Sequence, residues 1–170
     1  MSAMHLVAVG VAAAACATDL RTRRIPNALT LGAALAALAW RAMSGDAAVL
    51  GAGLGGWLVG ALILAVPFWL GGLGGGDVKL LAALGAWVGP SEALWIALYT
   101  GLTGGVLALA VALAHGYMGQ AARNIWLLLC HWRVAGLRAL PELTLDGSSA
   151  PRLAYALPIF CGVVVTTWLR

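Results

Sequence analysis

The stretch AAVLGAGLGGWLVGALILAVPFWL, residues 47–70, contains no charged side chain and decides the fold class. A helix needs about 20 predominantly apolar residues to cross the ~30 Å hydrocarbon core of a bilayer, and this stretch exceeds that length. The rest of the chain is similar, because 62% of its 170 residues are hydrophobic, only 9% are charged, and the mean hydropathy is +0.95. Soluble domains carry about 25% charged residues, so the composition predicts an all-α, polytopic membrane helix bundle.

Apolar runs divide the chain into about six candidate transmembrane helices within one domain, residues 1–170. They cover approximately residues 3–18, 27–43, 47–70, 77–90, 92–115 and 152–169. Between the fifth and sixth spans, residues 117–139 place most of their polar side chains on one arc, which predicts an interfacial helix inside a cytoplasmic segment of about 116–151. Residues 141–151 are predicted to be a loop. Close helix packing is predicted at three glycine pairs, Gly51/Gly55, Gly56/Gly60 and Gly101/Gly105.

Basic residues set the orientation of the bundle. With the N-terminus outside, the cytoplasmic loops and adjoining helix ends hold eight of the ten, namely Arg21, Arg23, Arg24, Lys79, Arg123, Arg133, Arg138 and Arg152. The outside keeps Arg41 and Arg170, which satisfies the positive-inside rule. The first span is predicted to be retained, because a signal peptide would carry its positive charges before the apolar run. The net charge of +4 is thus a topology signal, and no nucleic-acid partner is expected.

Two aspartates occupy positions where membrane proteins rarely place a carboxylate without a function. Asp19 ends the first span and Asp77 opens the fourth, so the predicted topology brings both to the cytoplasmic side at one depth. Burying a carboxylate near a bilayer costs a few kcal/mol or more, which makes each a candidate functional residue. A pair of carboxyl groups can act as general acid and general base on one water molecule.

Glycines precede the second aspartate in the sequence Gly74-Gly75-Gly76-Asp77. Glycine lets another chain approach closely, which would give room for an extended substrate beside the carboxylate. The predicted fourth span is too short for the hydrocarbon core, so either the bilayer thins locally or the glycine stretch dips into the membrane. We expect residues 71–76 to line a wet recess, since irregular backbone at membrane depth needs protein or water to satisfy it.

Residues around the two aspartates have supporting roles. Pro26 fixes a turn and suits the start of a helix, with Asn27 directly after it. Lys79 follows Asp77 by two positions, which places it on roughly the opposite helix face, so its ammonium is expected to reach the membrane interface instead of pairing with Asp77. The arginines between the aspartate and the proline are expected at anionic lipid headgroups: Arg21, Arg23 and Arg24.

The combination of Asp19 with Ile25-Pro26-Asn27, and of Gly-Gly-Gly-Asp-Val-Lys-Leu at residues 74–80, resembles the type IV prepilin peptidases. These are polytopic aspartic proteases of the Gly-x-Gly-Asp class, and the resemblance covers essentially the whole chain through the number and order of spans. It implies that Asp19 and Asp77 are the catalytic aspartates and that Gly74 and Gly76 are the family's glycines. Residues 155–158, Tyr-Ala-Leu-Pro, are similar to a further family stretch whose usual first proline is absent; they are given no catalytic role.

The resemblance further implies a prepilin substrate, cut between its leader and its hydrophobic helix at the cytoplasmic face of a prokaryotic inner membrane. The larger bifunctional members carry an N-terminal segment with Cys-x-x-Cys motifs and also methylate the new N-terminus. This chain has only the scattered Cys16, Cys130 and Cys161. It therefore resembles the short members linked to tight-adherence (Flp-type) pili, or archaeal preflagellin peptidases. The mechanism implied needs no metal and no organic cofactor.

Two other functions are compatible with parts of this sequence. A small ion-coupled transporter could use Asp19 and Asp77 in an ion pathway, but such proteins usually show an internal repeat, and the second half has no membrane-embedded acid. A presenilin-like protease would carry a Tyr-Asp pair in its first motif, where this chain has Thr18-Asp19. At this stage either aspartate can be the ionised member of the pair, which titrates as a unit.

Overall fold

The computed structural model describes residues 2–144 and 153–169. In this part of the chain every regular element is a helix and no strand is present, which confirms the predicted all-α class. The elements are α1 (Ala3–Thr22), α2 (Asn27–Ala42), α3 (Ala47–Trp69), α4 (Gly75–Val88), α5 (Pro90–Ala114), α6 (Met118–Ala135), the short 3₁₀ helix η1 (Pro141–Leu143) and α7 (Ala156–Leu169).

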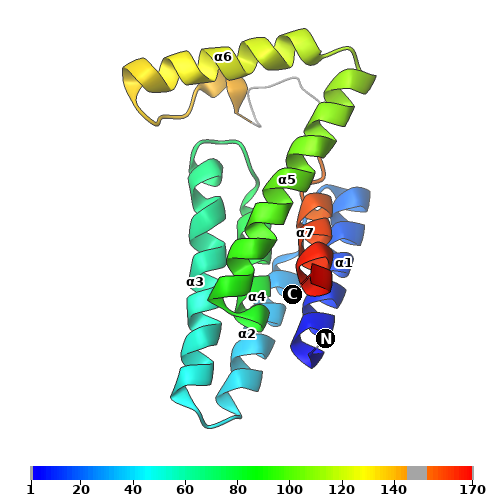
Figure 1. Cartoon of the computed structure of the whole chain (residues 1–170), viewed down its shortest axis with the longest axis vertical. Helices are drawn as coiled ribbons and strands as arrows, with labels where there is room; N and C mark the ends of the chain where they lie inside the picture. Colours follow the sequence, from blue (N-terminus) through cyan, green and yellow to red (C-terminus); the bar gives the residue numbers. More distant parts are fainter. Residues whose placement is uncertain (1, 145–152, 170) are drawn as a thin grey trace.

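All six apolar segments form helices, and these helices run along the long axis of the molecule, while α6 lies across one end (Figure 1). By length and composition, α1, α3 and α5 could each cross a membrane, whereas α7 is a shorter apolar helix. The turns that follow α1 and α3 lie at the α6 end, and the turn between α2 and α3 lies at the opposite end (Figure 1). Large apolar side chains such as Leu31, Leu62 and Leu102 are exposed on the bundle surface, as expected where lipid replaces water.

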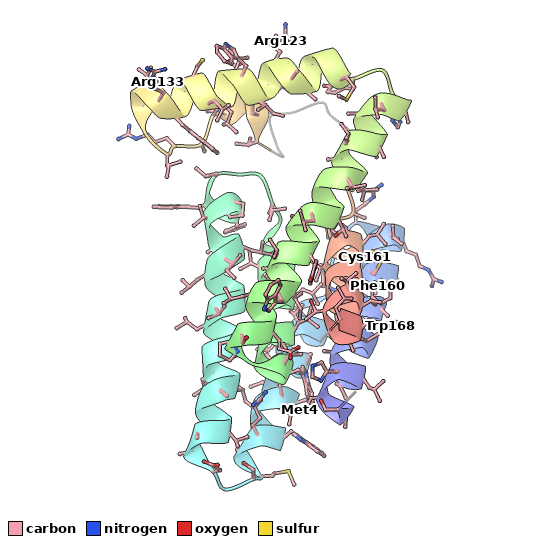
Figure 2. The ribbon with its side chains drawn as sticks, viewed as in Figure 1. Met4, Arg123, Arg133, Phe160, Cys161 and Trp168 are labelled. Carbon is pink, nitrogen blue, oxygen red and sulfur yellow. The ribbon has the colours of Figure 1, made fainter. Side chains whose placement is uncertain are left out.

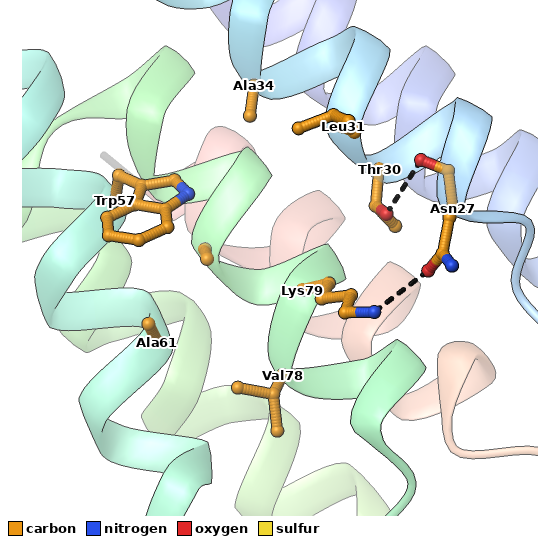
Figure 3. Close-up of a pocket in the computed structure, with 9 residues that line it drawn as sticks. Asn27, Thr30, Leu31, Ala34, Trp57, Ala61, Val78 and Lys79 are labelled. Atoms are coloured by element: carbon orange, nitrogen blue, oxygen red, sulfur yellow. Dashed lines mark hydrogen bonds between the residues drawn. The ribbon is translucent and has the colours of Figure 1, made fainter.

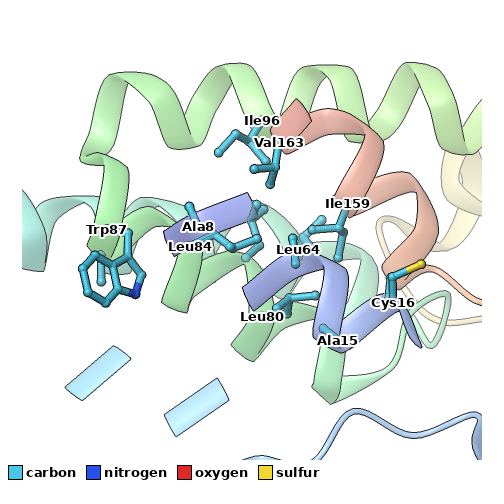
Figure 4. Packing of buried hydrophobic residues seen from close by; sticks show 14 of the residues in the cluster. Ala8, Ala15, Cys16, Leu64, Leu80, Leu84, Trp87, Ile96, Ile159 and Val163 are labelled. Carbon is cyan, nitrogen blue, oxygen red and sulfur yellow. The ribbon is translucent and has the colours of Figure 1, made fainter. Parts of the chain in front are cut away.

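Helix α4 is the centre of the bundle. It packs against α1, α2, α3, α5 and α7, and nine of its 14 residues are buried. Leu80, Leu81 and Leu84 are fully buried and join Ile159 and Val163 of α7 in the main core (Figure 4). A helix of this length rises only about 21 Å, less than the ~30 Å hydrocarbon core. Neighbouring helices enclose this short helix, so most of its surface faces protein.

The C-terminal end of α4 is satisfied by a buried arginine from α2. The Arg41 guanidinium donates to the carbonyl oxygens of Ala86 at 2.9 Å and Trp87 at 2.7 Å, and to that of Val49 in α3 at 3.1 Å. The last carbonyls of a helix lack intrahelical partners, and inside a membrane they must find others. Arg41 was expected to be an outside topology residue; it is buried and closes the end of the central helix.

Glycines bring α3 and α4 into backbone contact. A Cβ added at Gly56 would collide with the backbone of Gly85, and one at Gly60 would collide with the Leu81 carbonyl. This confirms the predicted packing role of the Gly56/Gly60 pair. The prediction was wrong for Gly101 and Gly105, where an added Cβ would meet nothing within 4 Å, and for Gly51, which is also open. Spacing alone does not tell which face of a helix meets a neighbour.

The α6 segment differs slightly from its predicted limits. The helix ends at Ala135, before the expected residue 139, and η1 lies in the stretch expected to be loop. None of its residues is buried, and Arg123 and Arg133 point away from the bundle (Figure 2). The predicted loop beyond residue 144, and the topology residues Arg152 and Arg170, lie outside the described residues.

Candidate active site

Asp19 lies in the last turn of α1 and is only 8% exposed. A carboxylate at this end faces the negative pole of its own helix, so it gives α1 no stabilisation. Its hydrogen-bond partner comes from the far end of the sequence, where the Ala156 N–H at the start of α7 donates to Asp19 Oδ2 at 3.3 Å. The positive N-terminal pole of α7 thus offsets the unfavourable position in α1.

Asp77 lies in the first turn of α4 and is likewise 8% exposed. The Gly74 N–H donates to Asp77 Oδ2 at 3.2 Å, and the Asp77 N–H donates to the Gly74 carbonyl at 3.1 Å. This reciprocal pair closes the start of the helix in the manner of a capping box. Asp77 therefore caps α4 as well as being a candidate catalytic residue, and a mutational test must keep the cap while it removes the ionisable group.

The fold brings the two aspartates together. Asp19 and Asp77 lie close enough for the charge of one carboxylate to act on the other, and Asp77 similarly interacts with the half-buried Tyr155. The site is thus assembled from three helix ends, the last turn of α1 and the first turns of α4 and α7. Two buried carboxylates with few hydrogen-bond donors around them are a candidate pair for general acid and general base chemistry.

The glycines before Asp77 lie close to other parts of the protein. Gly75 and Gly76 already belong to α4, and an added Cβ would lie 3.4 Å from Phe68 at Gly75 and 3.2 Å from Ile25 at Gly76. At these two positions the expected irregular, wet recess is not seen, because the backbone is helical and side chains cover it. At Gly74 an added Cβ would lie 3.2 Å from Asp77 Oδ2, so this glycine directly borders the carboxylate.

The remaining predicted residues, Pro26, Asn27 and Lys79, lie at or contact the start of α2. Pro26 is the N-cap residue of α2 and Asn27 is its first residue. The Lys79 ammonium donates to Asn27 Oδ1 at 2.9 Å, which ties α4 to the start of α2 (Figure 3). Among the described residues, Lys79 forms no ion pair with Asp77.

Sequence reasoning missed three contributors. Ala156 acts through its backbone N–H, which no side-chain pattern reveals, and Tyr155 had been given no role. Ile25 fills the face of Gly76, a contact between segments far apart in sequence. Among the described residues, no group of three or more His, Cys, Asp or Glu side chains is placed to hold a metal ion.

Comparison with known proteins identifies the family of this chain. Residues 6–109, which contain α1 to most of α5 and both aspartates, match the Type IV leader peptidase family. The chain belongs to this family. It is also 40% identical over 117 residues to the prepilin leader peptidase/N-methyltransferase of Dickeya chrysanthemi. That match covers 60% of this chain and 39% of the relative, so the chain spans well under half of that protein's length. No solved structure matches.

Proposed function

We propose that this protein is a membrane-embedded aspartic endopeptidase that removes the leader peptide from type IV prepilins of the Flp type. The observation that carries the proposal is the meeting of two buried carboxylates within the range that matches the leader peptidase family. Asp19 is the stronger indication of a catalytic role, because α1 gains no stability from a negative charge at its C-terminal end. Such a residue is retained at a cost to stability, which points to chemistry.

In the proposed mechanism the two aspartates share one proton. The ionised carboxylate takes a proton from water as the water oxygen attacks the scissile carbonyl carbon, and the protonated carboxyl donates to the carbonyl oxygen. The tetrahedral intermediate then collapses and the C–N bond breaks. The leaving nitrogen takes a proton from the carboxyl that first received it, and the hydroxyl formed from the carbonyl oxygen returns its proton to the other carboxylate. The amide is split into one acid and one amine, and the aspartate pair returns with one proton.

The neighbouring residues support substrate access and placement. Gly74 borders the Asp77 carboxylate without a side chain of its own, which leaves room there for an extended peptide. Gly75 and Gly76 let Phe68 and Ile25 pack against the start of α4. Pro26 and the Lys79–Asn27 hydrogen bond hold the start of α2 next to α4. These residues position the site and take no part in proton transfer.

The charge distribution supports a cytoplasmic active site in a prokaryotic inner membrane. Both aspartates lie at the end of the bundle that α6 crosses (Figure 1). That end also carries Arg21, Arg23 and Arg24, which we place at anionic headgroups of the inner leaflet. In this arrangement α6 lies on the cytoplasmic surface, and the whole chain acts as one peptidase domain.

The test is co-expression in bacterial membranes with a tagged Flp-type prepilin, followed by mass spectrometry of the pilin N-terminus. Asp19→Asn and Asp77→Asn should each lower cleavage by ~10²-fold or more, the contribution expected of a general acid or base. Asp77→Asn keeps an oxygen that can accept from the Gly74 N–H, so the helix cap survives while the ionisable group is lost. Asp46→Asn is the matched control, because Asp46 caps α3 at the opposite end of the bundle, with Oδ1 2.8 Å from the Ala48 N–H.

Cleaved pilin with the wild type and Asp46→Asn, and uncut pilin with the other two variants, would support the proposal. Near-normal cleavage by either Asp19→Asn or Asp77→Asn would contradict the aspartate pair. If the wild type inserted properly but left the pilin uncut, Flp-type specificity would fail, and ion transport through the aspartates would become the function to measure.

A further inference from the structure

A groove of 420 Å³ lies between α2, α3 and α4 (Figure 3), and neither aspartate lines it. Its apolar part includes Leu31 from α2, Trp57 and Ala61 from α3, and Ala82 from α4. One end is polar and is formed by Asn27 and Lys79. Leu31 and Trp57 are exposed on the bundle surface, so the groove opens to whatever surrounds the bundle. In a membrane protein that surrounding is lipid.

The polar end of the groove carries a positive charge without a negative partner. The Lys79 ammonium donates to Asn27 Oδ1, which is neutral, and among the described residues no carboxylate forms an ion pair with Lys79. Arg21 in the last turn of α1 and Arg24 on the turn that leads into α2 precede Asn27 in the chain and carry further positive charge. An ammonium at the edge of the hydrocarbon core attracts phosphate, and basic pockets between membrane helices bind anionic headgroups.

The shape and charge of the groove distinguish between two occupants. From Asn27 to Ala34 it follows α2 for about two turns, or ~10 Å. A peptide helix is about 10 Å wide and brings no fixed negative charge to the Lys79 ammonium at the polar end. A phospholipid instead carries a compact anionic group and a thin apolar chain in one molecule, which matches the polar end and the apolar floor.

We propose that this groove binds one anionic phospholipid, with its phosphate at Lys79 and Asn27 and an acyl chain along Leu31, Ala61 and Ala82. The bound lipid would bridge α2 and α4 within two residues of Asp77 and so hold the start of α4 in place. The inference rests on the membrane placement in the proposed function, but it does not depend on peptidase activity.

The experiment uses the full-length protein reconstituted in phosphatidylcholine vesicles that contain a trace of photoactivatable phosphatidylglycerol. After illumination, mass spectrometry maps the labelled peptides. Labelling should concentrate on the α2, α3 and α4 segments that line the groove. Lys79→Gln should lower it about fivefold, the effect expected of one basic residue near an anionic surface. Ala61→Phe should lower it by filling the apolar floor.

Two matched controls should leave the labelling unchanged. Arg133→Gln removes a positive charge from α6, and Ala110→Phe adds an aromatic ring on the exposed surface of α5. Photoactivatable phosphatidylcholine should label the groove weakly, and free inorganic phosphate should not compete, which distinguishes a lipid from a phosphate site. If Ala61→Phe fails to fold, Lys79→Gln still tests the headgroup contact.

Equal labelling by the two lipids, or equal labelling of Lys79→Gln and wild type, would overturn the proposal. So would a raised KM for prepilin in Lys79→Gln with unchanged lipid labelling, since that would assign the groove to substrate. Groove labelling by phosphatidylglycerol in a protein that cleaves no prepilin would leave this inference standing while the proposed function failed.

Discussion

The first turn of helix α4 contains Asp77, whose carboxylate accepts one hydrogen bond from Gly74. At the other end of α4 lies Arg41, whose guanidinium donates to three backbone carbonyls. Both charges suit the helix dipole, with the acid at the N-terminal pole and the base at the C-terminal pole. The two charged groups differ in how many hydrogen bonds they make within the protein. The Arg41 guanidinium donates to three backbone carbonyls, whereas the Asp77 carboxylate accepts one hydrogen bond and could accept several more.

This difference separates a structural charge from a candidate functional one at the same depth of burial. Asp77 and Arg41 are buried to a similar degree, so burial alone does not distinguish them. The number of polar partners does, because a buried polar group is normally satisfied by hydrogen bonds within the protein. A carboxylate that lies beside a second carboxylate and accepts one backbone bond is available to a substrate.

The largest effect on stability is expected from Arg41→Met. It leaves the carbonyls of Ala86, Trp87 and Val49 without their donor, so the free energy of unfolding should fall by at least about 3 kcal/mol. Reversible unfolding in detergent micelles measures this. Asp77→Asn, at the other end of α4, should change stability by less than about 1 kcal/mol, since the cap is kept. If Arg41→Met were as stable as the wild type, the structural reading of this end would be wrong.

The next effect is expected midway along α4, from Gly60→Leu. The new side chain would meet the Leu81 carbonyl and force α3 away from α4, at a cost of about 1–3 kcal/mol. Gly101→Leu is the control, because Gly101 is exposed and an added Cβ there would meet nothing within 4 Å. The two variants should separate clearly in thermal unfolding, and equal melting temperatures would contradict the packing described for this interface.

At the Asp77 end, Gly74→Ala should affect activity more than stability. Its Cβ would lie 3.2 Å from Asp77 Oδ2, and a small displacement of the carboxylate should slow prepilin cleavage about tenfold. Gly72→Ala, in the same turn but 3.4 Å from the Pro67 carbonyl, serves as the control. Cleavage rates at matched amounts of folded protein test this. If less protein folded but each folded molecule cleaved prepilin at the normal rate, Gly74 would be needed for folding and not for the reaction.

The smallest effect is expected from Glu92→Gln, which removes the carboxylate from the hydrogen bond between Glu92 and His5. Their side chains are separated by 3.0 Å and are 26% and 22% exposed. Partly exposed pairs contribute about 0–1 kcal/mol, so unfolding should shift by no more than that and cleavage should stay unchanged. A tenfold change in cleavage rate would show that the end of the bundle opposite the aspartates also controls the reaction.

The helices and the aspartate pair could be predicted because both depend on local sequence. An apolar run specifies a membrane helix by its length, and a charge inside such a run is conspicuous wherever it occurs. Arg41 is also a charge within an apolar run, yet its position near a helix end led to the prediction that it is a topology signal. Its partners are backbone carbonyls, and no sequence pattern marks those.

The remaining features depend on which faces meet in three dimensions. The glycines of α3 and α5 share the same spacing, but only Gly56 and Gly60 were correctly assigned, because helix rotation is set by neighbours and not by spacing. The enclosure of α4 likewise follows from packing, which made a 14-residue helix sufficient where a free span would need about 20 residues. The Ala156 contact with Asp19 required the fold itself.

The hydrogen bond between Ala156 and Asp19 joins residues 137 positions apart, and it has a consequence for biogenesis. During synthesis, α1 and α4 enter the membrane long before α7 is translated. Until the last helix inserts, the Asp19 carboxylate lacks its donor and the third wall of the site is missing. The aspartate pair acquires its final geometry as one of the last events of assembly, so an unfinished chain should have no working site with which to attack neighbouring membrane proteins.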